Sequence, residues 1–177
     1  MITTTTPAPR LCLTINGSKL AEGTAPSYEE LQPALRSIAL SDSPVIVRAP
    51  DEARQHLVEE LHRLGRRAQL PIHPCTSAQE AEPLFDSLTA RGETKPECLG
   101  TWALHDVGAW PRASQEKLSD LLEALDLGRL HGQLRHERIP RVVMLTSHAD
   151  APSILPSLAR RIGYFNLTAV PTAGKES

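Results

Sequence analysis

Two adjacent polar residues, His105 and Asp106, end a short apolar segment and precede a turn. Residues 100–104 are typical of a buried strand, and Gly108 and Pro111 indicate a break before the next helix. In an open parallel sheet, ligands bind and catalytic acids lie beyond the carboxyl ends of the strands. A histidine–carboxylate pair at such a place could serve in acid–base chemistry or bind a ligand. His105 and Asp106 are therefore the first candidate site.

Two further histidines are candidates at carboxyl ends of predicted strands: His73 near the end of one strand and His148 just after another, with Asp150 close to His148. If these strands are neighbours, imidazoles and carboxylates converge and could hold Zn²⁺ or another borderline metal. The alternative is that they are polar loop residues, since their spacing forms no compact ligand motif. We expect no metal site, and His73, His105 and His148 are the candidates if one exists.

A serine hydrolase is a further possibility at the same strand ends. Ser147 lies beside His148, and His105 and Asp106 could complete a triad. The sequence has no sharp glycine-containing turn that would expose a nucleophilic serine at a strand end. We therefore predict no catalytic residues.

Alternating strand and helix patterns must position these residues. Strands are predicted at 11–15, 44–47, 70–75, 99–104, 141–146 and 164–170, and helices at 27–40, 51–67, 77–88, 114–127 and 154–162. Residues 128–132 are predicted as a turn. The alternation implies βαβ crossovers, hence a three-layer α/β/α fold with a mostly parallel sheet. We predict one domain at 11–171, with flexible tails at 1–10 and 172–177.

Length and composition limit the class of protein. The chain has 177 residues, enough for one domain with a real core, and a net charge of −2. That charge leaves no electrostatic footprint for nucleic acid or an anionic membrane. The three cysteines are widely spaced, which fits a reducing compartment, and no apolar segment approaches the ~20 residues of a membrane span. We expect a cytoplasmic protein with no nucleic-acid or membrane partner.

The order and spacing of these segments, over residues 43–171, resemble the AAA+ ATPase core of sigma-54-dependent transcription activators. The matching segments are 44–48 before the phosphate-loop position, 60–64 in the next helix, 73–75, the Walker B strand and turn at 100–111, 115–125, 145–148, and 161–162 with 166–167. The resemblance implies a P-loop NTPase or AAA+-like core. The family's GAFTGA loop, helical lid and DNA-binding extension find no counterpart in the sequence.

The phosphate-loop position departs from the family pattern. A phosphate loop needs GxxxxGK[ST], in which glycines let backbone N–H groups surround the phosphates and the lysine reaches them. Here the corresponding residues are Ala49, Pro50, Asp51, Glu52, Ala53, Arg54 and Gln55. Pro50 has no N–H, and the two acids place negative charge at the helix N-terminus that would meet a phosphate. We expect no ATP binding in the family manner and no cofactor.

The Walker B position departs as well. The resemblance puts His105 where the family has its Mg²⁺-linked Asp, and Asp106 where it has the water-activating Glu. Histidine is a poor ligand for a hard cation that prefers oxygen. The resemblance therefore implies the fold, whereas the residues at both motifs predict a protein that is not an active ATPase.

These inferences favour a non-catalytic regulatory or scaffolding module that binds another protein, for example an AAA+ relative or a second copy of itself. Two alternatives stay open at this point. One is an ATP-binding, sigma-54-type transcription regulator, and the other is a metal-dependent enzyme that uses the strand-end histidines.

Overall fold

A central β-sheet organises the protein, which is seen here in a computed structural model that describes residues 11–15, 18–19, 28–88, 94–132, 136–146, 154–162 and 165–171. Within those ranges the sheet has the strand order β2-β1-β7-β3-β6-β5-β4. The strands are β1 (Leu11–Ile15), β2 (Ser18–Lys19), β3 (Val45–Arg48), β4 (Ile72–Cys75), β5 (Thr101–His105), β6 (Arg141–Thr146) and β7 (Phe165–Pro171). The five strands from β7 to β4 are parallel, and β1 and β2 add an antiparallel edge.

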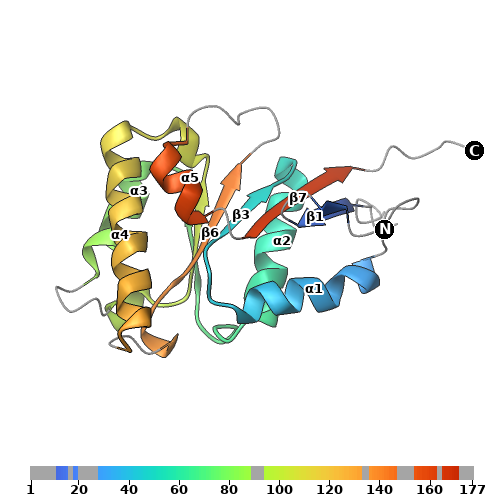
Figure 1. Ribbon diagram of the computed structural model, residues 1–177, viewed down its shortest axis with the longest axis horizontal. Helices are drawn as coiled ribbons and strands as arrows, with labels where there is room; N and C mark the ends of the chain where they lie inside the picture. Colours follow the sequence, from blue (N-terminus) through green and yellow to red (C-terminus); the bar gives the residue numbers. More distant parts are fainter. Residues whose placement is uncertain are drawn as a thin grey trace, which may run out of the picture.

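Helices cover both faces of this sheet, as Figure 1 shows. They are α1 (Tyr28–Leu40), α2 (Asp51–Leu64), α3 (Ala78–Asp86), α4 (Arg112–Leu130) and α5 (Pro156–Ile162), with 3₁₀ turns at Pro96–Cys98, Val107–Ala109 and His136–Arg138. One buried cluster joins α1 and α2 to the sheet, and a second joins α3, α4 and α5 to its other face. The predicted three-layer α/β/α fold with a mostly parallel sheet is therefore confirmed.

Alternation along each strand divides the core between the two layers. In β3, Val45 and Val47 pack with α1 and α2, whereas Ile46 packs with α3, α4 and α5. Every residue of β6 is buried, because helices cover both faces of this central strand. Strands of this kind are continuous apolar runs, which is why the sequence reveals them.

The connections define where a ligand crevice would lie. β3 leads into α2 on one face, and its neighbour β6 leads into α5 on the other face. A chain that leaves adjacent parallel strands in opposite directions opens a crevice at their carboxyl ends. The candidate residues of α2 and β5 lie at this edge of the sheet.

Several predicted boundaries differ from the structure. The predicted turn at 128–132 is wrong at its start, because α4 continues to Leu130 and Gly128 is buried in it. Packing of α4 on the sheet outweighs the cost of ~1 kcal/mol that glycine brings to a helix. Helix α2 ends at Leu64 rather than at Arg67, and the two-residue strand β2 was not predicted. The tails predicted at 1–10 and 172–177 lie outside the described residues.

One helix start follows its sequence signal closely. Ser77 precedes α3, and its hydroxyl accepts a hydrogen bond of 3.3 Å from the N–H of Glu80. Serine is favoured immediately before a helix, because its side-chain oxygen accepts a hydrogen bond from an N–H of the first turn that has no partner within the helix. Among the described helices, none combines the length and apolar composition needed to cross a membrane.

Candidate functional site

The connection between β3 and α2, at the position where the resemblance places a phosphate loop, is two residues long. β3 ends at Arg48 and α2 begins at Asp51, so only Ala49 and Pro50 lie between them. Of the residues aligned with the phosphate loop, Asp51, Glu52, Ala53, Arg54 and Gln55 all belong to the helix. A phosphate loop holds its anion with several backbone N–H groups that turn inward between strand and helix. The two residues of this connection offer no such series of inward-facing N–H groups.

The same connection is packed against the sheet. Ala49 has no exposed surface and Ala53 is buried behind it. The N–H of Ala49 donates to the carbonyl of Thr146 at the end of β6, over 3.2 Å. The carbonyl of Pro50 accepts from the N–H groups of Ala53 and Arg54, at 2.9 and 3.1 Å. The start of α2 is thereby closed onto the carboxyl ends of β3 and β6.

Arg54 is the central charged residue of this edge, and it is 5% exposed. Its Nε donates to the carbonyl of Ala49 at 3.0 Å, and its Nη1 lies 3.3 Å from Oδ1 of Asp106. The same Nη1 is 3.2 Å from Oδ1 of Asp51, whose side chain is largely exposed. Arg54 therefore ties the start of α2 to the end of β5, and two carboxylates offset its charge.

A left-handed backbone turn places Asp106 for this contact. Its φ and ψ are 51° and 43°, a conformation that aspartate adopts more readily than most residues. The N–H of Asp106 donates to the carbonyl of Leu145 at 2.8 Å, and its carbonyl accepts from Ala109 at 2.8 Å. The indole of Trp110 donates to the carbonyl of His105 at 3.0 Å. The backbone around Asp106 is thus held on both sides.

His105 is partly buried at the same strand end. Burial lowers the pKa of its imidazole, and the nearby positive charge of Arg54 lowers it further. The carboxylates of Asp106, Asp51 and Glu80 act in the opposite direction without overcoming these effects. The ring is therefore neutral at neutral pH. It lies beside the ion pair of Arg54 with Asp106, so the neighbouring carboxylate already has a cationic partner.

His73 does not join this group, contrary to the expectation that it follows a strand end. It lies inside β4, where Cys75 still pairs with Leu104, and its Nε2 is 3.0 Å from the carbonyl of Leu99. His73 pairs with Trp102, and Trp102 lies three residues before His105 in β5. The two histidines are therefore about 10 Å apart along the strand direction, and their side chains face opposite sides of the sheet. They cannot hold one ion together.

The remaining candidates are not part of the described structure. His148, Asp150 and Ser147 lie outside the described residues. Within the described part of the chain, no three His, Cys, Asp or Glu side chains form a group that could hold a metal ion.

The linking role of Arg54 was not predicted from the sequence. The sequence signals only a local pair, because Asp51 and Arg54 are three residues apart on one helix face. The other partner, Asp106, is 52 residues away along the chain. Only the strand order brings the two together.

No family model and no curated protein matches this chain. Solved structures do match it. The P-loop NTPase domain of the sigma-54 transport activator from E. coli has a TM-score of 0.54 and 18% identity, and the match covers 82% of this chain and 95% of that one. NtrX from Brucella abortus, also solved with ADP and with ATP, has a TM-score of 0.55 and 21% identity over 84% of this chain.

The match spans 37% of the NtrX chain. A DNA polymerase III gamma subunit-related protein from Thermotoga maritima has a TM-score of 0.51 and 11% identity, over 81% of this chain and 47% of that one. Identities this low show the fold alone. The protein has an α/β fold with a five-stranded parallel core, like that of P-loop NTPases and similar to the NTPase domains of sigma-54 activators.

Proposed function

We propose that this protein is a non-catalytic interaction module built on a P-loop NTPase-like core, with a regulatory or scaffolding role toward another protein. One observation carries the proposal: Arg54 of α2 is buried at the carboxyl edge of the sheet and bound to Asp106. In a nucleotide site of this fold, that edge must accept phosphates and a cation.

Phosphate binding would require large local changes. The buried Ala49 and Ala53 would have to separate from the sheet before backbone N–H groups could face an anion. Asp51 and Glu52, both exposed in the first turn of α2, would repel the phosphates. Both effects oppose nucleotide binding. Residues 48–55 contain no lysine that would offset them.

Cation binding is opposed as well. The Asp106 carboxylate is the acid best placed for a metal at the end of β5, and it is paired with Arg54. His105 beside it offers an imidazole, which is a weak ligand for Mg²⁺. A cation at Oδ1 of Asp106 would compete with the guanidinium of Arg54, which lies 3.3 Å from that atom. The edge is therefore suited to hold the fold together rather than to hydrolyse ATP.

A thermal-shift and calorimetric titration with Mg-ATP tests this proposal, with NtrX from Brucella abortus as the positive control. A ligand at 100 times its Kd stabilises a protein by about 2.7 kcal/mol. We expect that shift for NtrX and none for this chain at millimolar Mg-ATP. A saturable shift in this chain, or release of phosphate that disappears in Asp106→Asn, would overturn the proposal.

A further inference from the structure

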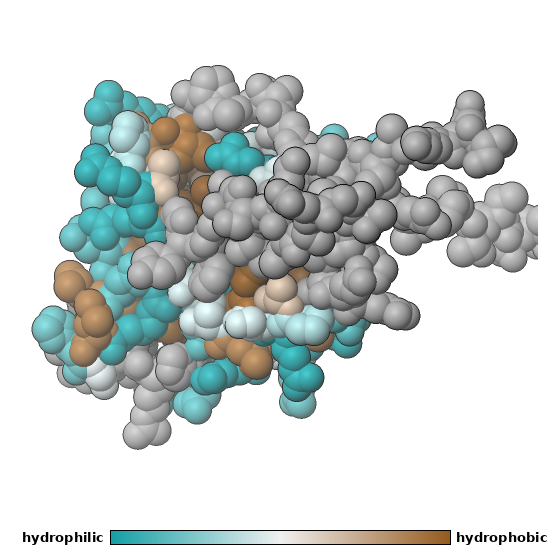
Figure 2. Space-filling model, turned by 45° about the vertical axis from the view of Figure 1, so that its right-hand side comes forward, coloured by the Kyte–Doolittle hydropathy of each residue, from teal (hydrophilic) through white to brown (hydrophobic). Residues whose placement is uncertain are grey.

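A polar side chain of α4, Gln115, is buried near the carboxyl edge of the sheet. It is 3% exposed, whereas Arg112, Glu116 and Lys117 near it on the helix are exposed. The upper left of Figure 2 shows the hydrophilic surface that α4 turns to the solvent. A buried amide costs free energy unless its donors and its acceptor form hydrogen bonds. The partners of Gln115 therefore indicate which segments it holds together.

Gln115 joins the turn after β5 to the start of α5. Its Nε2 donates to the carbonyl of Trp110 at 3.2 Å and to that of Gly108 at 3.4 Å. Its Oε1 accepts a hydrogen bond from the N–H of Leu155 at 3.0 Å, and Leu155 directly precedes α5. One buried side chain therefore bridges two segments that are far apart along the chain.

The same turn, residues 106–110, is joined on its other side to α2, and we call it the Asp106 turn. Nη1 of Arg54 lies 3.3 Å from Oδ1 of Asp106. Within the turn, the N–H of Ala109 donates to the carbonyl of Asp106 at 2.8 Å, and the N–H of Trp110 donates to the carbonyl of Val107 at 3.0 Å. Because these bonds close the turn into one short unit, a change in the backbone of Asp106 moves the carbonyl groups further along it.

The left-handed backbone of Asp106 needs these contacts. A residue with a side chain disfavours this conformation, and it persists where the surrounding structure holds it from more than one side. Here Arg54 holds the side chain of Asp106, and Gln115 holds the carbonyls of the turn. The helices behind these two anchors, α2 and α5, pack on opposite faces of the sheet (Figure 1). The Asp106 turn therefore connects the two helical layers around the edge of the sheet.

We propose that the Asp106 turn is a conformational relay between the start of α2 and the start of α5. Arg54 and Gln115 together hold it in the left-handed form, and the loss of either contact lets the backbone of Asp106 move to a commoner conformation and loosens the other contact. A partner that changes the contacts of one helical layer thereby changes those of the other, and the effect is reciprocal. The inference goes beyond the proposed function, because the coupling does not depend on what binds at this edge.

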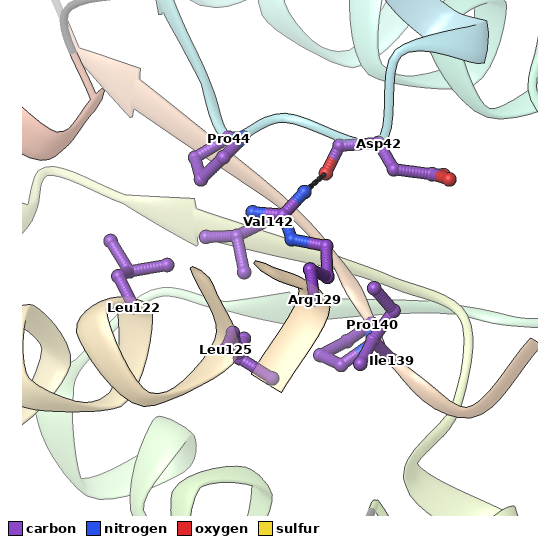
Figure 3. Close-up of a pocket in the computed structure, with 8 residues that line it drawn as sticks. All are labelled: Asp42, Pro44, Leu122, Leu125, Arg129, Ile139, Pro140 and Val142. Carbon is purple, nitrogen blue, oxygen red and sulfur yellow. Dashed lines mark hydrogen bonds between the residues drawn. The ribbon is translucent and has the colours of Figure 1, made fainter. Parts of the chain in front are cut away.

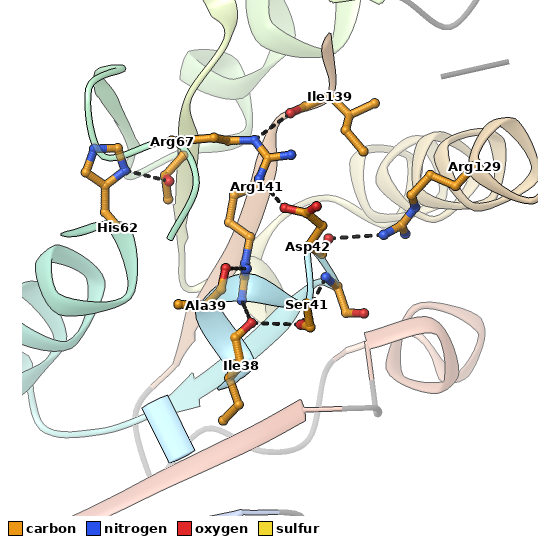
Figure 4. A network of polar contacts seen from close by, with 11 residues as sticks. Ile38, Ala39, Ser41, Asp42, His62, Arg67, Arg129, Ile139 and Arg141 are labelled. Atoms are coloured by element: carbon orange, nitrogen blue, oxygen red, sulfur yellow. Dashed lines mark hydrogen bonds and ion pairs between the residues drawn. The ribbon is translucent and has the colours of Figure 1, made fainter. Parts of the chain in front are cut away.

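The opposite end of the sheet offers a matched control. Buried contacts there join the connections before β3, β4 and β6 (Figure 4). Arg129 of α4 belongs to this group, because its Nη1 donates to the carbonyl of Asp42 at 3.1 Å (Figure 3) and it pairs with Asp126. Arg129 is about 21 Å from Gln115 along α4. Like Arg54, it binds a backbone carbonyl and a carboxylate, so Arg129→Met removes similar contacts without touching the Asp106 turn.

A double-mutant cycle in the full chain measures the coupling. Arg54→Met and Gln115→Met each remove one anchor of the Asp106 turn, and urea unfolding gives the stability of each variant. If the loss of one anchor already frees the turn, the loss of the second costs less. We therefore expect the unfolding equilibrium constant of the double variant to be at least about threefold below the product of the two single effects. The control pair, Arg54→Met with Arg129→Met, should agree with that product within about twofold.

Amide hydrogen exchange of the native chain and of Arg54→Met, followed by NMR, measures the transmission to α5. We expect the N–H of Leu155 to exchange at least about tenfold faster in Arg54→Met. The N–H of Leu70, which donates to the carbonyl of Arg67 at 2.8 Å at the opposite end of the sheet, should change by less than about twofold.

Two results would overturn the inference: an additive cycle of Arg54→Met with Gln115→Met, or exchange at Leu155 that rises no more than exchange at Leu70. If Gln115→Met does not fold, the exchange measurement decides alone, because Arg54→Met retains Gln115. Asp106→Ala removes the carboxylate and disfavours the left-handed form, so it should accelerate exchange at Leu155. Asp106→Asn tolerates that form and should accelerate it less, and the reverse order of these two variants would also contradict the relay.

Discussion

Arg54 in α2 and Asp106 at the end of β5 are joined by a 3.3 Å contact across the carboxyl edge of the sheet. The contact lies where the resemblance to AAA+ proteins places the phosphate loop and the Walker B acid opposite one another. A residue from each position now binds the other. Each of these two charged side chains therefore has a partner of opposite charge within the protein.

Removal of Arg54 should destabilise the protein. Arg54→Met keeps most of the apolar stem but leaves the carbonyl of Ala49 without its side-chain donor and Asp106 without its cation. We expect the free energy of unfolding in urea to fall by about 1–3 kcal/mol. Asp51→Asn is the control, because that carboxylate is exposed and should cost less than about 1 kcal/mol. Equal stability of Arg54→Met and the native chain would contradict this role.

The ion pair between Asp42 and Arg67 should contribute more to the free energy of unfolding than the ion pairs at the surface do. Both side chains are buried, and Asp42 also has a left-handed backbone with φ of 58°. Asp42→Ala removes the carboxylate from a cluster of arginines, so we expect a loss of about 3–5 kcal/mol in urea unfolding. Asp126→Asn, which changes the partly exposed partner of Arg129, should cost about 0–1 kcal/mol. Similar losses in the two variants would refute the distinction.

Two glycines with positive φ, Gly100 before β5 and Gly132 after α4, offer a direct test of the packing at the start of β5. At Gly100, φ is +130° and an added Cβ would lie 2.0 Å from the carbonyl oxygen of Pro71. At Gly132, φ is +65° and an added Cβ would meet nothing within 4 Å. We expect Gly132→Ala to cost about 1 kcal/mol from its backbone conformation alone. Gly100→Ala should cost about 2 kcal/mol more, because backbone must move. Thermal unfolding of both variants measures the difference.

Two partly buried histidines should make the protein less stable in mild acid. Burial lowers the pKa of both His105 and His62 from 6.5. As the pH falls, the unfolded chain therefore takes up these protons before the folded chain does. The stability that depends on both rings being neutral is fully present above about pH 6.5. It is lost as the pH falls toward the pKa values of the two histidines in the folded chain. His105→Gln should reduce the slope of unfolding free energy against pH below that point.

The histidine titration also reports on Arg54. The charge of Arg54 is one cause of the low pKa of His105, so Arg54→Met should raise the pKa of that imidazole. NMR titration of the ring protons measures the pKa of His105 in the native chain and in Arg54→Met. His62 in the same spectra serves as the internal reference. A pKa of His105 that stays the same in Arg54→Met would show that its charge does not act on the ring.

The three-layer fold could be predicted because its signals are local. The apolar run of β6 indicates a strand covered on both faces, the serine before α3 indicates a helix start, and leucines at helical spacing indicate α4. The absence of glycine and lysine from residues 48–55 is equally a property of the chain itself. These features depend on neighbours a few residues apart, so the order of amino acids suffices to predict them.

Contacts between distant segments required the folded structure. The register of β4 on β5 separates His73 from His105, although both looked like strand-end residues. The strand order brings Arg54 to Asp106 across 52 residues, and folding likewise brings Asp42, which follows α1, to Arg67, which follows α2. Periodicity along the chain predicts which side chains are buried. It does not predict which strands are neighbours or how they are aligned. Those two properties determine which charges meet, and they arise only when the whole sheet assembles.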